Sequence, residues 1–106
     1  MYKVYVLIDP ITNKQRYIGI TCRKLCRRLK AHLRDANRMK FKPEHPKSSN
    51  KLKCDWINGL LAFDYKPLIE ELFVFQDLDC AKVKEVELIN GDPSLLNMTK
   101  GGEYNY

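Results

Sequence analysis

Six side chains of this sequence carry phenol, guanidinium, imidazole, carboxylate and amide groups suited to phosphodiester cleavage. They are Tyr5, Tyr17, Arg28, His32, Glu85 and Asn97. One carboxylate, Glu85, could bind a single divalent metal ion, which would polarise a phosphoryl oxygen and stabilise the leaving group. Arg28 could neutralise the charge that develops on the phosphate. A tyrosine could deprotonate water only if nearby cations lower its pKa from the usual value of about 10.

The sequence lacks the residues that several other kinds of catalytic or metal-binding site need. No carboxylate pair is spaced for a two-metal site, and no glycine-rich phosphate loop is present. A nucleophilic Cys26 near His32 has no evident oxyanion donors. A zinc site could be built from Cys22, Cys26, His32 and His45. Its spacing matches no standard zinc pattern, so we interpret the four cysteines as free thiols that act as small apolar residues.

The charge of the chain is strongly asymmetric. Residues 1–53 hold fifteen Lys and Arg against three Asp and Glu, and residues 54–106 hold four against ten. This asymmetry predicts one face that binds a polyanion, although a solvated basic face without a partner would have the same composition. The expected nucleic-acid contacts are Lys3, Gly19, Arg23, Lys24, Arg27, Lys40, Lys42 and Lys51.

The composition predicts one α+β domain over residues 1–106, with a basic loop at 38–50 and a tail at 98–106. Of the 106 residues, 44% are hydrophobic, which suffices for one modest core. No stretch approaches the length that spans a membrane, and the apolar run at 4–8 is too short for a signal peptide. We therefore expect a cytoplasmic protein with reduced thiols.

Alternating apolar residues predict a hairpin of two strands over residues 2–9 and 15–21. The residues expected to face the core are Tyr2, Val4, Val6 and Ile8. Matching the core faces of the two strands puts Tyr5 and Tyr17 on the same side of the sheet. Gly19, inside the second strand, indicates a close approach of backbone or ligand.

A first helix is predicted over about residues 24–37. At about 100° per residue, its leucines and Ala36 define an apolar stripe, and Arg28 and His32 fall at the edge of that stripe. Arg27 points to solvent. The helix therefore distinguishes two adjacent arginines, of which Arg28 is half-sheltered beside the sheet.

A second helix, a third strand and a third helix are predicted over residues 50–63, 67–75 and 78–90. The apolar residues of the second helix are Leu52, Trp56, Ile57, Leu60 and Leu61. In the third helix, Glu85 lies in the middle of the apolar stripe and Glu87 faces water. A carboxylate on a buried face is costly unless it is paired or holds a metal, and the sequence leaves both roles open for Glu85.

The sequence resembles the GIY-YIG nuclease family in five elements that occur in order. Lys3-Val4-Tyr5 stands where Gly-Ile-Tyr would be, and Tyr17-Ile18-Gly19 matches the second motif literally. The other three elements are an arginine-x-x-x-histidine helix at Arg28 and His32, a glutamate helix at Glu85 with Leu88-Ile89, and a closing segment at 93–97 with Gly101-Gly102. Five elements at fitting spacing are far more specific than one three-residue motif.

The resemblance implies a small α/β (α+β) fold, in which a three-stranded antiparallel central sheet is flanked by helices. It also implies a DNA endonuclease that needs Mg²⁺ or Mn²⁺ and cuts one strand at a time. Glu85 would bind the metal ion. Tyr5 would be the first candidate for the general base, with Tyr17 orienting the water or the phosphate.

For the remaining site residues, the resemblance implies supporting roles. Arg28 and His32 would hold the phosphate and tune the tyrosine, and Asn97 would orient these groups. The helical angles, obtained without the family, select the same Arg28 over Arg27. Lys3, in place of the family's glycine, would add a cation on the face of Tyr5.

DNA is the expected partner, with specificity set by DNA structure, by a homodimer or by a partner protein. A phage or mobile-element origin is expected from the habits of the family. Two alternatives stay open: a non-catalytic nucleic-acid-binding module that keeps the fold, and a protein-interaction domain. Nicking of plasmid that depends on Glu85 would distinguish an enzyme from both.

Overall fold

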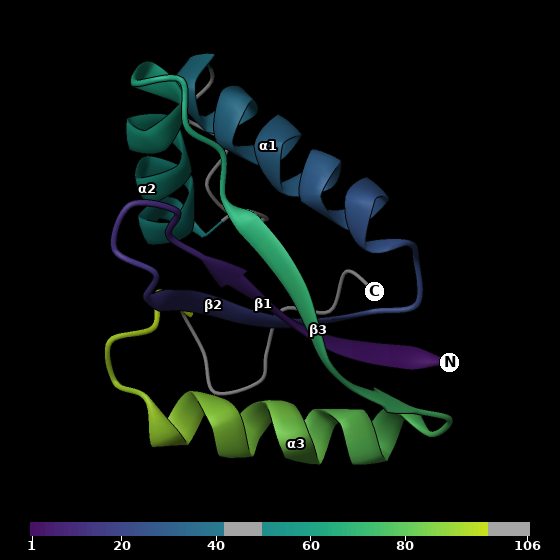
Figure 1. The fold of residues 1–106 in the computed structure, drawn as a ribbon. Coiled ribbons are helices and arrows are strands. Elements are labelled where there is room, and N and C mark those ends of the chain that lie inside the picture. The colour runs from purple at the N-terminus through teal and green to yellow at the C-terminus, as the bar shows by residue number, and fades with distance from the viewer. Residues whose placement is uncertain (42–49, 98–106) are drawn as a thin grey trace.

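The computed structural model describes residues 1–41 and 50–97 of the chain (Figure 1). Its elements, in order, are β1 (Tyr2–Ile8), β2 (Gln15–Thr21), α1 (Leu25–Phe41), α2 (Lys51–Ala62), β3 (Leu68–Phe75) and α3 (Leu78–Gly91). The predicted contact Lys42, the loop residue His45 and the predicted tail at 98–106 lie outside the described residues.

The three strands form one antiparallel sheet in the order β2-β1-β3. Between β1 and β2, Tyr5 lies opposite Gly19 and Leu7 lies opposite Tyr17, so both tyrosines project from the same face. The predicted three-stranded antiparallel sheet flanked by helices is confirmed. The shared face of Tyr5 and Tyr17, predicted from the hairpin alternation, is also confirmed.

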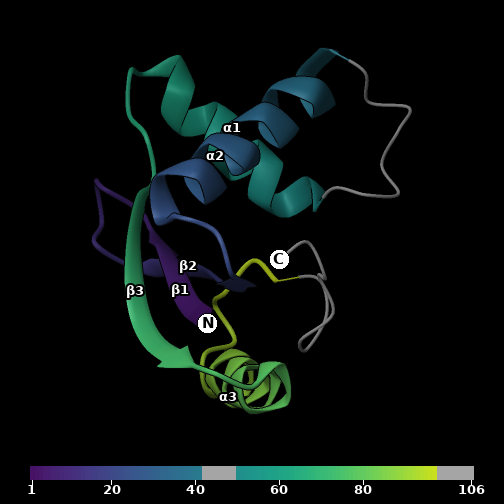
Figure 2. The same ribbon diagram turned by 90° about the vertical axis from the view of Figure 1, so that its right-hand side faces the viewer.

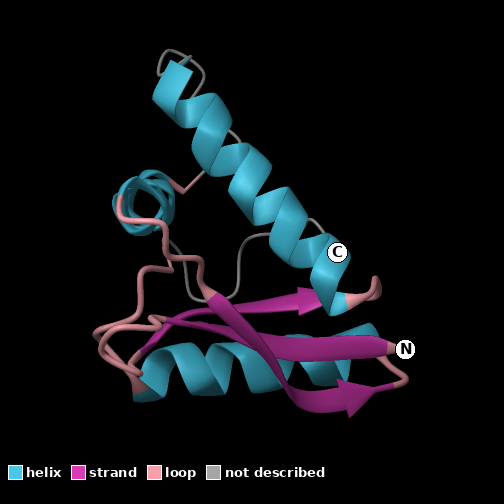
Figure 3. Cartoon of the chain, turned by 45° about the horizontal axis from the view of Figure 1, so that its top comes forward, coloured by secondary structure: helices cyan, strands magenta, loops and turns pink. Residues whose placement is uncertain are grey.

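Helices cover both faces of the sheet, which therefore forms the middle of three layers (Figures 1 and 2). The face packed by α3 carries the apolar cluster Val4, Val6, Ile18 and Ile20, joined by Ala81 and Ile89. Helices α1 and α2 cover the other face of the sheet, as Figure 3 shows. This face carries Tyr5, Leu7 and Tyr17. Strand alternation predicted only the first of these faces as core, because it cannot reveal what packs on the second.

The buried face of α1 has polar residues at its centre. Its buried side chains are Arg28, His32, Ala36 and Met39, whereas its three leucines are only half-buried. The prediction that Arg28 and His32 lie at the edge of the buried stripe is therefore wrong. Hydrogen bonds to the sheet allow these two polar groups to be buried, and the leucines are displaced to the margin.

Helix α1 also extends beyond the predicted end at residue 37. Met39 packs with Ala36, Cys54 and Ile57 in a cluster between α1 and α2, which favours the additional turn. Arg38 and Lys40 lie in this last turn, where positive charge is stabilised by the helix dipole. Residues 38–41 of the predicted basic loop are thus helical.

Helix α2 begins at the predicted cap, since the Asn50 side chain accepts a hydrogen bond from the Lys53 backbone N–H at 3.0 Å. Its buried residues are Lys53, Cys54, Ile57 and Leu60. Leu52 is 59% exposed, so its predicted membership of the apolar stripe is wrong. Trp56 is half-buried beside two apolar clusters and donates its indole N–H to Asp9 at 3.0 Å.

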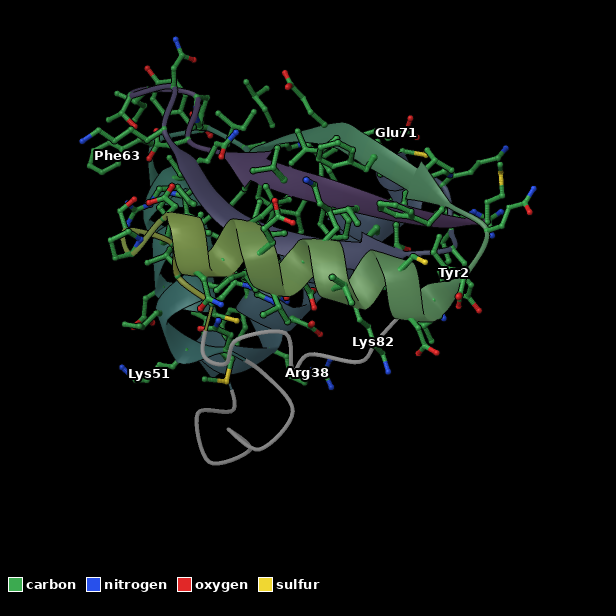
Figure 4. The ribbon with its side chains drawn as sticks, turned by 90° about the horizontal axis from the view of Figure 1, so that it is seen from below. Tyr2, Arg38, Lys51, Phe63, Glu71 and Lys82 are labelled. Carbon is green, nitrogen blue, oxygen red and sulfur yellow. The ribbon has the colours of Figure 1, made fainter. Side chains whose placement is uncertain are left out.

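Helix α3 is capped by Asp77 and buries Ala81, Glu85 and Ile89. Glu87 is exposed, so the predicted orientations of the two glutamates are confirmed. Viewed from the side of α3, this helix lies across the sheet (Figure 4). None of the helices in the described part of the chain is both long and apolar enough to cross a membrane.

Candidate active site

The hydroxyl group of Tyr5 is held by two side chains of α1. The Arg28 Nε–H donates to the Tyr5 oxygen at 3.0 Å, and the same oxygen lies 2.7 Å from His32 Nε2. Tyr5 and His32 are fully buried, and Arg28 is 6% exposed. The predicted association of Tyr5, Arg28 and His32 is therefore present in the structure, and the one-turn spacing of Arg28 and His32 aims both at one oxygen atom.

The electrostatics of this cluster keep His32 neutral. Burial, followed by the positive charges of Lys53 and Arg28, lowers the pKa of His32 well below the usual 6.5. Because the Tyr5 oxygen accepts from Arg28, its own hydrogen can be donated to His32 Nε2. We therefore assign the imidazole proton to Nδ1, which is buried and has no hydrogen-bond partner among the described residues.

Arg28 stays charged inside the cluster. Burial by itself would lower the pKa of Arg28, but the Tyr5 oxygen, with smaller effects of Tyr17 and Asp35, raises the pKa above its ordinary value. A buried guanidinium beside a phenol favours negative charge on that phenol or on an anion bound next to it. Arg27 is exposed, as the helical angles predicted.

Tyr17 forms the second half of the cluster. Its ring centroid lies 6.5 Å from that of Tyr5 and 5.2 Å from that of His32 in an edge-on arrangement. The ammonium of Lys53, from the first turn of α2, lies 5.0 Å from the Tyr17 ring centroid. Lys53 is a residue that the sequence analysis missed. Its helical spacing from the buried Ile57 and Leu60 is the signal that could have found it.

Gly19 gives the Tyr5 ring the room that it needs. A Cβ atom at this position would lie 2.5 Å from Cζ and 2.8 Å from Cε1 of Tyr5, and it would also collide with the Tyr5 hydroxyl. The close approach predicted at Gly19 is therefore that of the Tyr5 ring. Gly19 is buried, and its predicted contact with nucleic acid gains no support from this arrangement.

Asn97 pairs with the outer edge of β2. Its side chain accepts from the Ile18 N–H at 3.0 Å and donates to the Ile18 carbonyl at 2.7 Å, as a neighbouring strand would. The preceding Leu96 N–H donates to the Arg16 carbonyl at 2.6 Å. Both the oxygen and the nitrogen of the Asn97 side-chain amide are thus hydrogen-bonded to the backbone of Ile18, which lies between Tyr17 and Gly19. Asn97 fixes that strand edge, and any orienting effect on the phenols acts through the backbone.

Glu85 comes from the other layer of the molecule. It is 3% exposed on the sheet-facing side of α3, between Ala81 and Ile89. The contacts described above bring five side chains together on the opposite face of the sheet. We call this group the phenol cluster; it consists of Tyr5, Tyr17, Arg28, His32 and Lys53. The edge strands are β2 and β3, and β2 carries Tyr17, so a site shared by Glu85 and this phenol would form around the edge of β2.

The residues present are compatible with a metal ion that is held mainly by its substrate. In residues 1–41 and 50–97, no three His, Cys, Asp or Glu side chains gather into a metal-binding group. Mg²⁺ in phosphoryl-transfer sites is often bound through one or two carboxylates, with waters and substrate phosphates as the other ligands. The buried carboxylate of Glu85 would be that protein ligand. Cys22 and Cys26 are exposed at the surface, whereas His32 is buried and hydrogen-bonded to Tyr5, which argues against the zinc alternative.

The predicted nucleic-acid contacts differ in exposure. Arg23, Lys24, Arg27, Lys40 and Lys51 are exposed. Lys3 is half-buried and donates to the Arg23 carbonyl at 3.1 Å, so it links β1 to the start of α1. In Figure 4, Arg38 and Lys51 lie on the β2 side of the molecule and Glu71 lies on the β3 side. Arg38 and Lys51, which pair with Asp35 and Asp55, are thus on the side of the molecule that carries β2.

A scan against protein-family models, a search of curated proteins and a search of solved structures found no match for this chain. The resemblance to the GIY-YIG nucleases therefore depends on the motifs quoted above. These motifs and the geometry of the phenol cluster together support a proposed function.

Proposed function

We propose that this protein is a metal-dependent endonuclease of the GIY-YIG type that hydrolyses phosphodiester bonds in DNA. The observation that carries the proposal is the Tyr5 hydroxyl, which is held between a charged Arg28 and a neutral His32. A structural tyrosine needs one partner for its hydroxyl. Here the oxygen also accepts from a buried cationic donor, which favours the ionised form that a phenolic base requires.

In the proposed reaction, Tyr5 is the general base for the attacking water. The Arg28 Nε–H stabilises negative charge on the phenolic oxygen, and His32 Nε2 accepts the hydrogen bond of the neutral phenol. Once Tyr5 has released its proton to solvent, the Arg28 guanidinium would be the charged donor to the phenolate oxygen, because His32 stays neutral. Tyr17, beside both rings, would orient the phosphate or the water.

Glu85 would hold Mg²⁺ or Mn²⁺ at the outer edge of β2. The metal ion, when bound, would polarise a phosphoryl oxygen and stabilise the leaving alkoxide. The Glu85 side chain is buried on the sheet-facing side of α3. Asn97 would keep the β2 edge in register with the phenols through its two hydrogen bonds to Ile18.

The decisive experiment is a plasmid-nicking assay with Mg²⁺ and with Mn²⁺, using wild type, Glu85→Gln and Glu87→Gln. Both substitutions remove one carboxylate from α3, but only Glu85 is buried toward the sheet. We expect Glu85→Gln to abolish nicking and to leave DNA binding largely intact, while Glu87→Gln nicks like wild type. Equal activity of all three proteins would refute the metal role of Glu85.

A second measurement tests the geometry at the strand edge. Mn²⁺ is paramagnetic and broadens NMR signals of nuclei near it. If Glu85 holds the ion at the edge of β2, sub-stoichiometric Mn²⁺ will broaden the ring signals of Tyr17 and the amide signals of Asn97. The same titration of Glu85→Gln should leave these signals sharp.

A non-catalytic nucleic-acid-binding module is the second candidate function. It is favoured by one observation, namely that Glu85 belongs to the layer opposite the phenols. Such a module would bind DNA with a steep salt dependence and would not nick it. The proposal also includes a cytoplasmic location, a phage or mobile-element origin, and specificity that is supplied by a partner protein or a homodimer.

A further inference from the structure

Lys53 is buried where lysines are rarely found. Its residue is 2% exposed, on the inner face of the first turn of α2. Lysine is almost never fully buried without a compensating interaction, because removing an ammonium from water is costly. The groups around Lys53 in the phenol cluster therefore indicate its role.

The surroundings of Lys53 indicate what its charge acts on. Its ammonium lies 5.0 Å from the centroid of the Tyr17 ring, within the range of a cation–π interaction. The same charge contributes to the lowered pKa of His32, after the larger effect of burial. Lys53 therefore acts electrostatically on two members of the cluster from a helix that carries none of the family motifs.

We propose that Lys53 is a further positioning residue of the site, which stabilises negative charge on the Tyr17 phenol and on a phosphate bound beside it. This inference deepens the proposed function and depends on it for the phosphate. The two phenols then have different partners. Tyr5 is coupled to Arg28 and His32 on α1, and Tyr17 is coupled to Lys53 on α2.

The charged and titratable groups around Tyr17 come from each element that packs on this face of the sheet. They are Tyr5 from β1, Arg28 and His32 from α1, and Lys53 from α2. On β3, Glu71 lies opposite Tyr5 and is exposed, so water screens its charge. Since His32 is neutral, Arg28 and Lys53 are the cations that these described groups place beside the phenol.

The test compares Lys53→Met, Lys53→Arg and the control Lys66→Met. Methionine keeps most of the apolar stem and removes the charge, whereas arginine keeps the charge. Lys66 is exposed in the segment before β3, away from the groups described above. We expect Lys53→Met to lower kcat for nicking on the order of tenfold or more, with KM changed less than kcat. Lys53→Arg should recover part of the loss, and Lys66→Met should match wild type.

Two readouts separate this role from a structural one. In NMR titrations of ring-labelled tyrosine, assigned with Tyr17→Phe, the alkaline transition of Tyr17 should move to higher pH in Lys53→Met. In Lys53→Arg, which keeps the positive charge, the alkaline transition of Tyr17 should stay at its wild-type pH. A merely structural lysine would leave that transition where it is in both variants.

Wild-type kcat in Lys53→Met would overturn the inference. So would a Tyr17 titration that does not change. If wild type itself does not nick DNA, the proposed function fails, and the Tyr17 titration alone decides the role of Lys53: a shift supports it and no shift refutes it.

Discussion

At the scale of single residues, the Tyr5 hydroxyl is the centre of the candidate active site. It is fully buried, accepts from a guanidinium and lies 2.7 Å from an imidazole nitrogen. A buried cationic donor to a phenolic oxygen favours its ionised form, which is the form that acts as a base. This donor favours Tyr5 as the base, a choice that the sequence left open between Tyr5 and Tyr17.

The first prediction concerns Tyr5→Phe. The substitution leaves Arg28 Nε and His32 Nε2 buried without their shared partner, at a cost of about 1–3 kcal/mol. We expect a lower urea midpoint and loss of nicking. Tyr17→Phe should retain more activity than Tyr5→Phe. The reverse order of the two variants would make Tyr17 the base.

The second prediction concerns the pH dependence of stability. The pKa of His32 is lowered on folding, so the unfolded chain binds a proton near pH 6.5 that the folded chain does not. Stability should therefore be full above about pH 6.5 and should fall below it, by up to about 1.4 kcal/mol per pH unit. Urea unfolding between pH 7 and pH 5 measures this slope, and His32→Gln should remove that contribution. An unchanged slope in His32→Gln would mean that His32 is not held neutral.

At the scale of elements, β2 and α1 position the cluster together. β2 contributes Tyr17 and the space at Gly19, and its outer edge is closed by Asn97. α1 contributes Arg28 and His32 from successive turns of one face. The arrangement depends on the register of the hairpin, since a shift of β2 by one residue against β1 would turn Tyr17 to the face opposite Tyr5.

The third prediction uses two glycines. In Gly19→Ala the new methyl group would meet the Tyr5 ring at 2.5 Å, so the ring must move and we expect a loss of about 1–3 kcal/mol. Gly59→Ala is the control, because nothing lies within 4 Å of a Cβ there and the residue is in α2. Alanine at Gly59 should stabilise the protein by roughly 0.5–1 kcal/mol. Thermal unfolding of both variants gives the comparison, and a harmless Gly19→Ala would contradict the close packing.

At the scale of the whole molecule, charge is separated between two sides. The exposed residues Arg27, Lys30 and Arg34 recur at helical spacing on the outer face of α1, and Glu70 and Glu71 are exposed on β3. Figure 4 has Arg38 and Lys51 on one side and Glu71 on the other. A polyanion would therefore approach the molecule from the side of α1 and β2.

The fourth prediction follows from this separation. Replacing Arg27, Lys30 and Arg34 together by Gln should weaken DNA binding and flatten the plot of log affinity against log salt, by about 1 for each phosphate that is no longer neutralised. Nicking at low salt should persist, because the phenol cluster is untouched. Lys66→Gln, which removes an exposed charge elsewhere, should leave the slope as it is. Equal slopes in wild type and the triple variant would show that DNA binds to another surface.

Sequence reasoning was strongest where it depended on local periodicity. Strand alternation and helix capping predicted all six elements, and the helical angles separated Arg28 from Arg27 and Glu85 from Glu87. It was weaker where the answer depended on a partner element. The angular positions on an isolated helix predicted that the leucines of α1 form the centre of its buried face. That prediction uses only the apolar character of the side chains, and it does not include hydrogen bonds to a phenol on a strand.

By itself, the sequence determined the order of the elements, the opening hairpin, the common face of Tyr5 and Tyr17, and the inward direction of Glu85. These follow from spacing along the chain, which local geometry converts directly into faces. Only the tertiary structure decided that both faces of the sheet are buried, that Arg28 and His32 share one phenolic oxygen, and that Lys53 rather than Leu52 turns inward. It also decided that Glu85 belongs to the layer opposite the phenols. Each of these depends on how separate elements pack, and packing is set by contacts between residues far apart in the chain.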